Sequence, residues 1–572
     1  MSIDTPIQSI LALDIGATLT HAALLEPVEG VHRLIASTST ATTLHPKVDL
    51  VQSLHRSVDR LQEIVQRPLL DEQDVPSMPR QGQQGIDALV ITLSVAAPLE
   101  CALIGLTEDL SLRSARAACL SSHTIIHSET VLAQERHARH RDLAALRQDP
   151  PEVIIIVGGV DGGPVHQVID AAGLLATLFA DVDPQLRPTV IYAGNQEARR
   201  PIAAALGPDF RYEVVDNVQP TPDLSSPQEL QRELAQLYER YKFPELAGYD
   251  TLSEWASIPP MPSQTALRTI LQFLSRRGPY GPRVLGVDVG GRQTTTALID
   301  GRLVSSQSTQ VGMSQGLENL LAAVDTDSIL RWLPTRDLAQ RAAAQLANQA
   351  LRPQSLPTEP DDVILILAAM REALRLTLTG LALTMDDQPR EAWPLDAIAA
   401  RGGAFLQSRP DAQATLALLD AVQPIGSTHM LLDWASIWPQ LGALAQIEPL
   451  ATLQILDHDA LLDLGTVVGL PGQGEADKTA ASLRLVRNVG GAQVAEIAWG
   501  HLLRLDMDHG ETAILEIEPM SGAWHDSKAT RSVKVRGGRL GLILDARGRP
   551  LVLSDDAYRR RGEIQAWINE LS

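Results

Sequence analysis

The sequence has few of the residues on which several classes of protein depend. Only 3% of its 572 residues are aromatic and its formal net charge is −21, so base-stacking platforms and basic footprints for nucleic acid are not expected. Two cysteines, Cys101 and Cys119, are too few for a disulfide framework or a four-ligand zinc site. We therefore expect no nucleic-acid partner and a reduced, cytoplasmic compartment.

Long apolar runs are also missing. The longest candidate, Val363 to Met370, is cut off by Arg371 and Glu372, far short of the roughly 20 residues that a membrane span needs. The first residues lack the basic segment of a signal peptide and lead directly into an apolar strand. A soluble protein without membrane contact is the expectation, and the sequence gives no oligomeric state.

A repeated motif organises what is present. Leu11 to Glu26 (LALDIGATLTHAALLE) and Val284 to Asp300 (VLGVDVGGRQTTTALID) each have an apolar run, an Asp-x-Gly turn with threonines, and a second apolar run. This pattern predicts a β-hairpin. Glycine allows the backbone to approach a ligand, and turn amides and threonine hydroxyls can donate to phosphate oxygens. The strand-end carboxylates, Asp14 and Asp288, can hold a hydrated Mg²⁺.

Each motif supplies four candidate nucleotide-binding residues. They are Asp14, Gly16, Ala17 and Thr18 in the first motif, and Asp288, Gly290, Gly291 and Thr294 in the second. The repeat resembles the two phosphate loops of the actin/Hsp70/sugar-kinase ATPase superfamily, in which two related α/β domains face each other across a nucleotide cleft. The resemblance also implies an adenosine-binding turn after a buried strand, which Gly402 and Gly403 fit within LDAIAARGGAF.

A second resemblance covers nearly the whole chain. The segments that carry it are VIIIVGGVDGG, VIYAGNQEAR, VVDNVQPTPD, RWLP, LLDAVQPIGST and LDLGTVVGLPG. They resemble the glutamate mutase L family, abbreviated MutL or GlmL and unrelated to the mismatch-repair protein of the same abbreviation. This resemblance implies an ATP-dependent chaperone or reactivator of adenosylcobalamin-dependent carbon-skeleton mutases, with ATP and Mg²⁺ as cofactors and mutase subunits as partners.

The second loop departs from the family pattern. Relatives commonly read Asp-Ile-Gly-Gly-Ala-Thr-Thr-Asp, whereas this chain has Arg292 and Gln293 inside the turn and Thr295 in place of the second aspartate. Losing that carboxylate weakens metal binding or the polarisation of water, and no catalytic base can be named. Binding with weak hydrolysis and binding without it both stay open, as do a small-molecule kinase and a nucleotide-free scaffold.

The chain divides into four predicted parts. We expect the halves of a duplicated actin-like (ribonuclease H-like) α/β core at 1–125 and 246–472, an inserted α/β domain at 126–245, and a mainly-β domain at 479–572 that folds independently. Two details can be checked directly. Ser263 is expected to cap a helix, and Asp161 is either a ligand or part of a tight structural turn.

Overall fold

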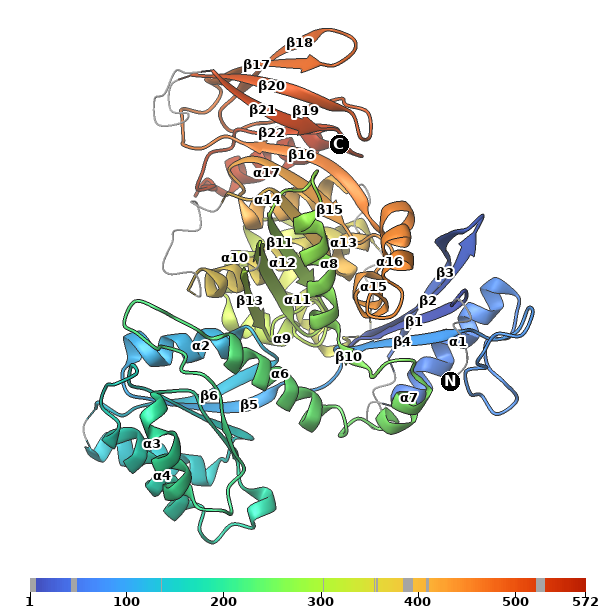
Figure 1. The fold of residues 1–572 in the computed structure, drawn as a ribbon. Coiled ribbons are helices and arrows are strands. Elements are labelled where there is room, and N and C mark those ends of the chain that lie inside the picture. The colour runs from blue at the N-terminus through green and yellow to red at the C-terminus, as the bar shows by residue number, and fades with distance from the viewer. Residues whose placement is uncertain are drawn as a thin grey trace. The chain divides into compact units, whose positions relative to one another are not determined.

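The computed structural model describes residues 7–42, 49–134, 136–301, 303–353, 355, 359–383, 394–407, 411–520 and 530–572. The chain forms two compact units. Their residues can be located in Figure 1, where the colour runs from blue to red along the chain. The first comprises Met1–Val95, Ala247–Ser305 and Thr309–Ser572, and the second comprises Ala96–Leu246 with Ser306–Ser308. The second unit thus begins at Ala96, whereas we expected the inserted domain to begin at residue 126. The other predicted boundaries stay predictions.

The first half of the core is a five-stranded sheet in the order β10-β4-β1-β2-β3. Its strands are β1 (Ile10–Ile15), β2 (Leu19–Val28), β3 (Val31–Ala41), β4 (Ala88–Leu93) and β10 (Met261–Pro262). The first three form an antiparallel meander, and β4 runs parallel to β1. Every residue of β1 is buried, because α1 (Leu50–Val65) and α15 (Trp438–Leu444) both pack against it. Its apolar pattern, interrupted only by Asp14, follows from burial on both faces.

The second half repeats this order. An eight-stranded sheet has the order β13-β12-β11-β14-β15-β16-β22-β19. Its first five strands are β11 (Arg283–Val289), β12 (Thr294–Asp300), β13 (Leu303–Thr309), β14 (Ala397–Arg401) and β15 (Gly426–Leu432). Strands β11 and β12 pair antiparallel, and β14 runs parallel to β11, as β4 does to β1. The predicted duplicated core is confirmed.

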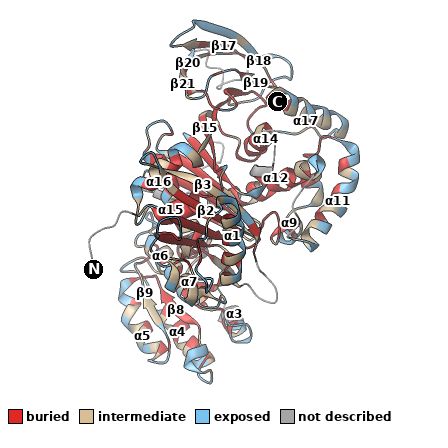
Figure 2. Ribbon diagram, turned by 90° about the vertical axis from the view of Figure 1, so that its right-hand side faces the viewer, coloured by how far each residue is buried: buried red, intermediate tan, exposed pale blue. Residues whose placement is uncertain are grey.

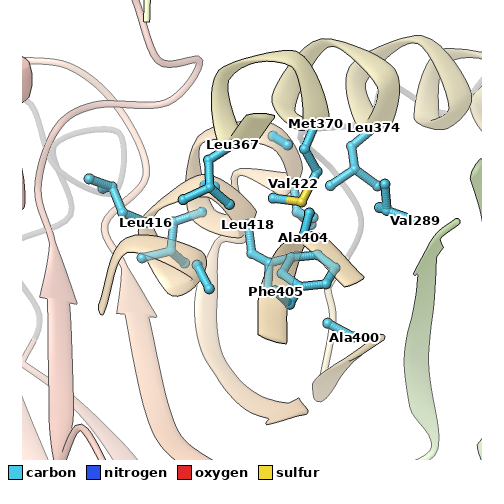
Figure 3. Packing of buried hydrophobic residues seen from close by; sticks show 14 of the residues in the cluster. Val289, Leu367, Met370, Leu374, Ala400, Ala404, Phe405, Leu416, Leu418 and Val422 are labelled. Carbon is cyan, nitrogen blue, oxygen red and sulfur yellow. The ribbon is translucent and has the colours of Figure 1, made fainter. Parts of the chain in front are cut away.

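Helices cover one face of the second sheet, and α11 exposes its other side to solvent in Figure 2, whereas α14 is almost entirely buried. They are α9 (Leu317–Ala323), α10 (Thr326–Leu330), α11 (Arg336–Leu351), α12 (Pro360–Leu383), α13 (Gly403–Gln407) and α14 (Asp411–Val422). Figure 3 shows Phe405 of α13 packed among Ala400, Ala404 and Leu418 under α12. This packing holds the start of α13 against the end of β14.

A second core joins the two halves. Ile10 and Val90 of the first sheet share it with Val284 and Leu431 of the second, through α8 (Ser263–Arg276) and α15. Helix α8 contacts β4 as well as β11 and β12, and it packs along α15. One face of α8 is apolar and faces this core, since Ala266, Leu267, Ile270, Leu271 and Leu274 are all buried. α7 (Tyr249–Trp255) precedes this helix, and α16 (Pro449–Ile455) follows α15.

The C-terminal strands belong to two sheets. β17 (Thr479–Arg487), β18 (Ala492–Ala498), β20 (Thr512–Pro519) and β21 (Arg531–Arg536) form a separate four-stranded sheet. By contrast, β16 (Leu462–Gly469), β22 (Leu542–Asp545) and β19 (Leu502–Leu505) complete the eight-stranded sheet, and α17 (Ala557–Leu571) packs on α14. This pairing corrects the expectation of independent folding, because the segment after 479 finishes the sheet of the ATPase-like core.

The second unit is a five-stranded parallel sheet in the order β6-β5-β7-β8-β9. Its strands are β5 (Leu99–Gly105), β6 (Thr124–Val131), β7 (Val153–Val157), β8 (Thr189–Tyr192) and β9 (Tyr212–Val214), and its helices are α2 (Arg113–Leu120), α3 (Arg136–Gln148), α4 (His166–Leu178), α5 (Arg199–Leu206) and α6 (Gln228–Lys242). Both cysteines are buried in it as free thiols. In the described parts of the chain, no helix is long and apolar enough to cross a membrane.

Candidate functional site

The two predicted hairpins match residue for residue. In the first, Asp14 pairs with His21 in the ladder and the Gly16 amide donates to the Leu19 carbonyl at 2.9 Å. In the second, Asp288 pairs with Thr295, and the Gly290 amide donates to the Gln293 carbonyl at 3.0 Å. The internal repeat therefore extends to the register of the strands and the hydrogen bond that closes each turn. It also shows that the Gly16 and Gly290 amides, expected to face phosphate, are used inside the turns.

Both hairpins border one cleft in the first unit. The turns are in direct contact, because a Cβ on Gly291 would lie 2.2 Å from Thr18 Oγ1, and Gln315 Nε2 donates to the Ala17 carbonyl at 2.8 Å. The cleft measures about 1050 Å³, open solvent included. Predicted residues in its lining are Asp14, Gly16, Ala17, Thr18, Asp288, Gly290, Gly291, Gly402 and Gly403.

One predicted residue is placed differently. The Thr294 hydroxyl donates to the Val311 carbonyl at 2.8 Å, and Thr294 is not part of the lining that the structure describes. Side chains alternate between the faces of a strand, and the neighbouring Thr295 accepts a hydrogen bond from Gln264 of the lining at 2.6 Å. The Thr294 side chain therefore lies on the opposite face of β12 from that of Thr295, where it stabilises the hairpin.

Asp14 is held by hydroxyl groups from two other elements. Its Oδ1 accepts hydrogen bonds from Thr92 Oγ1 at 2.9 Å and from Ser263 Oγ at 2.6 Å. Ser263 is the first residue of α8, which has Pro262 at its N-cap position and no side-chain cap. The predicted capping role of Ser263 is wrong, because its hydroxyl donates across the core to Asp14 instead.

The centre of the site is an arginine that the sequence analysis did not single out. Arg401 ends β14 and pairs with Asp288 in the parallel ladder. Its Nη1 lies 3.1 Å from Asp288 Oδ2, its Nη2 lies 3.1 Å from Asp14 Oδ2, and its Nε lies 3.4 Å from Asp433 Oδ2. One buried guanidinium thus joins the aspartates of both hairpins. A single arginine at the end of an otherwise apolar strand, next to the Gly-Gly turn, was the available sequence signal.

The charges of the site are set by burial and by Arg401. Burial alone would lower the pKa of Arg401, but Asp288, Asp14 and Asp433 outweigh it and raise that pKa, so the guanidinium stays charged. Burial raises the pKa of Asp288 despite Arg401. It also raises the pKa of Asp433 to about 6, although Arg401 and two backbone amides oppose the shift. For His21, burial lowers the pKa to about 4, so this imidazole is neutral at pH 7.

The Gly-Gly turn follows Arg401 directly. Gly402 has φ +126°, and a Cβ there would lie 2.1 Å from the Val289 carbonyl oxygen, so only glycine fits. Gly403 is the first residue of α13. The predicted adenosine turn therefore lies directly against the end of β11, beside the second hairpin.

Thr18 carries a polar atom that the described protein leaves unsatisfied. Its Oγ1 is buried and has no hydrogen-bond partner among the described residues, although buried hydroxyls are normally bonded. Because Thr18 lines the cleft, a ligand oxygen is a suitable partner. The donor set fits a phosphate group at this point.

A Mg²⁺ coordinated directly by both carboxylates does not fit the arrangement, and the Mg²⁺ held through water stays a prediction. The guanidinium of Arg401 already lies between the Asp14 and Asp288 carboxylates, where a cation with ligands at about 2.1 Å would have to sit. Among the described residues, no group of three or more His, Cys, Asp or Glu side chains is arranged to hold a metal ion. We therefore derive no role for Mg²⁺ here.

A duplicated core with two Asp-x-Gly hairpins on one cleft defines a protein of the actin-like ATPase fold. More particularly, a family model described as MutL protein matches residues 10–460, and the chain belongs to this family. The predicted family resemblance is confirmed, while the quoted segment LDLGTVVGLPG at 462–472 lies beyond the matched residues.

Solved structures resemble this chain only at low sequence identity and low TM-score. No curated protein matches the chain. A nucleotide-free diol dehydratase-reactivating factor is similar at 11% identity over 77% of this chain and 99% of its own, with a TM-score of 0.31. A glycerol dehydratase reactivase is similar at 12% identity over 77% of this chain and 100% of its own, with a TM-score of 0.30. A xylulose kinase from Bifidobacterium adolescentis is similar at 11% identity over 81% of this chain and 97% of its own, with a TM-score of 0.29. At such TM-scores these similarities carry no argument about function.

Proposed function

We propose that this protein binds ATP in the cleft and acts in the cytoplasm as a chaperone-like or reactivating partner of an adenosylcobalamin-dependent carbon-skeleton mutase. Membership in the MutL family supports the partner. The observation that carries nucleotide binding is the pair of register-matched hairpins on one cleft, together with the Thr18 hydroxyl of the first turn, which has no partner among the described residues.

The cleft offers a place for each part of a nucleotide. The two hairpin turns contact each other at Gly291 and Thr18, and they would receive the phosphates. The Gly402-Gly403 turn would receive the adenosine. Since the first hairpin belongs to one half of the core and the second to the other, a ligand that contacts both turns would favour one angle between the halves. A partner could sense that change as an altered surface.

The kinase alternative is less well supported. A kinase needs a general base close to the acceptor hydroxyl. Asp14 and Asp288 are the carboxylates among the described lining residues, and Arg401 is paired with both. Arg401 therefore already occupies one oxygen of each carboxylate that a general base would use.

Calorimetry with ATP tests nucleotide binding. We expect saturable heat for the intact protein. Asp288→Ala should weaken binding by about tenfold, or 1.4 kcal/mol, because it removes a partner that positions Arg401 in the cleft. Asp161→Ala is the matched control, since Asp161 accepts hydrogen bonds from Asn217 and Gln196 within a turn of the second unit. No heat at millimolar ATP would support the nucleotide-free scaffold, and equal effects of the two substitutions would mean that the cleft is misplaced.

The partner is tested with a carbon-skeleton mutase inactivated by a damaged cobalamin. Recovery of mutase activity should require this protein, free adenosylcobalamin and ATP together. Recovery at the same rate without this protein, or no association with any mutase in sedimentation experiments, would contradict the partner role. ADP release that depends on an added hydroxyl or carboxylic acid acceptor would favour the kinase instead.

A further inference from the structure

Arg401 occupies the place in the cleft that a divalent cation would need. Its two terminal nitrogens lie 3.1 Å from one carboxylate oxygen of each hairpin, and only 10% of its side chain is exposed. The planar guanidinium, with donors in a fixed fork, suits two carboxylates at once. This contact joins residues 387 positions apart in the chain.

A second arginine brings the net formal charge of the described cleft lining to zero. The charged side chains among the described lining residues are Asp14, Asp288, Arg292 and Arg401, so two negative charges meet two positive charges. His21, also in the lining, is neutral at pH 7 because burial lowers its pKa to about 4. Asp433 is not part of the described lining and accepts the Ile437 and Trp438 amides.

Arg292 stands where the first hairpin has Thr18. Both are the third residue of the turn, two positions after the glycine whose amide closes it. The guanidinium of Arg292 donates to the Val95 carbonyl at 2.9 Å, which holds it at the wall of the cleft. The two arginines together bring the double positive charge that one Mg²⁺ would supply.

We propose that Arg401, with Arg292, replaces the divalent cation of the cleft, so that this protein binds nucleotide phosphates without Mg²⁺. The inference rests on the proposed nucleotide site and specifies its counter-ions. Arginine binds phosphate oxygens through charge-assisted hydrogen bonds, and it needs no dehydration of a bound cation. Arg292 in the turn, and Thr295 where relatives have a second aspartate, both agree with a cleft whose positive charge comes from side chains.

The first test uses Mn²⁺ alone, followed by electron paramagnetic resonance. The intact protein should leave added Mn²⁺ free at this site, because the guanidinium holds both carboxylates. Arg401→Ala should bind one Mn²⁺ per chain, and Arg401→Ala with Asp288→Asn should lose that site again. Arg292→Ala is the matched control, as it removes a cleft arginine without freeing the Asp14–Asp288 pair, and it should create no site. Mn²⁺ bound to the intact protein, and abolished there by Asp288→Asn, would overturn the proposal.

The second test measures ATP affinity by calorimetry in EDTA and in millimolar Mg²⁺. The intact protein should give dissociation constants within about threefold in the two buffers, whereas Arg401→Ala should need Mg²⁺ and lose at least tenfold in EDTA. A loss of tenfold or more for the intact protein in EDTA would overturn the proposal. Absence of binding in both buffers would instead reject the nucleotide site, and the Mn²⁺ experiment would still decide the role of Arg401. The measurements on the intact protein hold even if Arg401→Ala fails to fold.

Discussion

Two buried clusters of arginine and aspartate lie in the first unit, and they differ in the balance of charge. The C-terminal cluster has three guanidinium groups for two carboxylates. Arg547 donates to Asp545 at 2.9 and 3.0 Å and to Asp420 at 2.6 Å, Arg549 adds a bond to Asp545, and Arg371 adds one to Asp420. The guanidinium of Arg547 also lies 4.8 Å from the ring centre of Trp567.

The cleft cluster has the opposite composition. There, Arg401 alone faces Asp14, Asp288 and Asp433. Burial raises the pKa of Asp433 to about 6. In the C-terminal cluster burial also acts to raise the pKa of Asp545, but Arg547 and Arg549 hold that pKa well below its usual range.

This difference separates a structural cluster from a functional one. Each C-terminal carboxylate accepts hydrogen bonds from two guanidinium groups and is almost fully buried, so the cluster stabilises a single arrangement. The three cleft carboxylates share one guanidinium, and Asp14 and Asp288 border open space, so their protonation and their partners can change. The following predictions test this contrast, from the largest expected effect to the smallest.

Ending the chain at residue 475 should be the most damaging change. It removes β22 and β19 from the central sheet, along with Trp567 and Ile543 from the core, and each buried apolar side chain contributes roughly 1.5–3 kcal/mol. We expect an insoluble chain or a urea midpoint far below that of the intact protein. A truncated chain with an unchanged midpoint would show that the last strands add nothing to the core.

Arg547→Met should be the most destabilising of the point substitutions. It leaves Asp545 and Asp420 buried with fewer donors, and breaking such a pair costs about 3–5 kcal/mol. Urea denaturation followed by circular dichroism measures the loss. The control is Arg484→Met, because the Arg484 pair with Glu516 is exposed and should contribute less than about 1 kcal/mol. Similar losses for both variants would contradict a structural role for the cluster.

Arg401→Ala should cost less, about 2–3 kcal/mol. The three carboxylates that it leaves behind can take up protons, and two of them border a cleft that admits water. The loss should therefore be smaller at pH 5 than at pH 7, whereas the loss for Arg547→Met should depend little on pH in this range. Equal pH behaviour of the two variants in urea denaturation would remove the distinction between the clusters.

Local pattern predicted the parts of the site that depend on neighbouring residues. The Asp-x-Gly turns, the apolar face of α8 and the Gly-Gly turn all follow from short-range spacing, and the register of the two hairpins bears this out. Arg401 and the Ser263 hydroxyl were missed because their partner, Asp14, is distant in sequence. The alternating C-terminal segments predicted strands correctly, but alternation does not specify which sheet a strand joins, and β22 joined the core.

The smallest predicted effect concerns Asp433. Its pKa is raised from 3.8 to about 6 in the folded protein, chiefly by burial, so between these values the folded state holds a proton that the unfolded state has released. The contribution of Asp433 to stability is therefore complete below about pH 4 and is lost as the pH rises through about 6. Carboxylates with lowered pKa values, such as Asp459 and Asp463, produce the opposite slope, so the informative quantity is the difference between the intact protein and Asp433→Asn.

Urea denaturation at intervals from pH 4 to pH 7 should show the stability of the intact protein falling relative to that of Asp433→Asn. Asp181→Asn serves as the control, because Asp181 is exposed, and it should follow the intact protein throughout. A constant difference between the intact protein and Asp433→Asn would mean that Asp433 is already ionised at pH 4, and the cleft would then be as fully compensated as the C-terminal cluster.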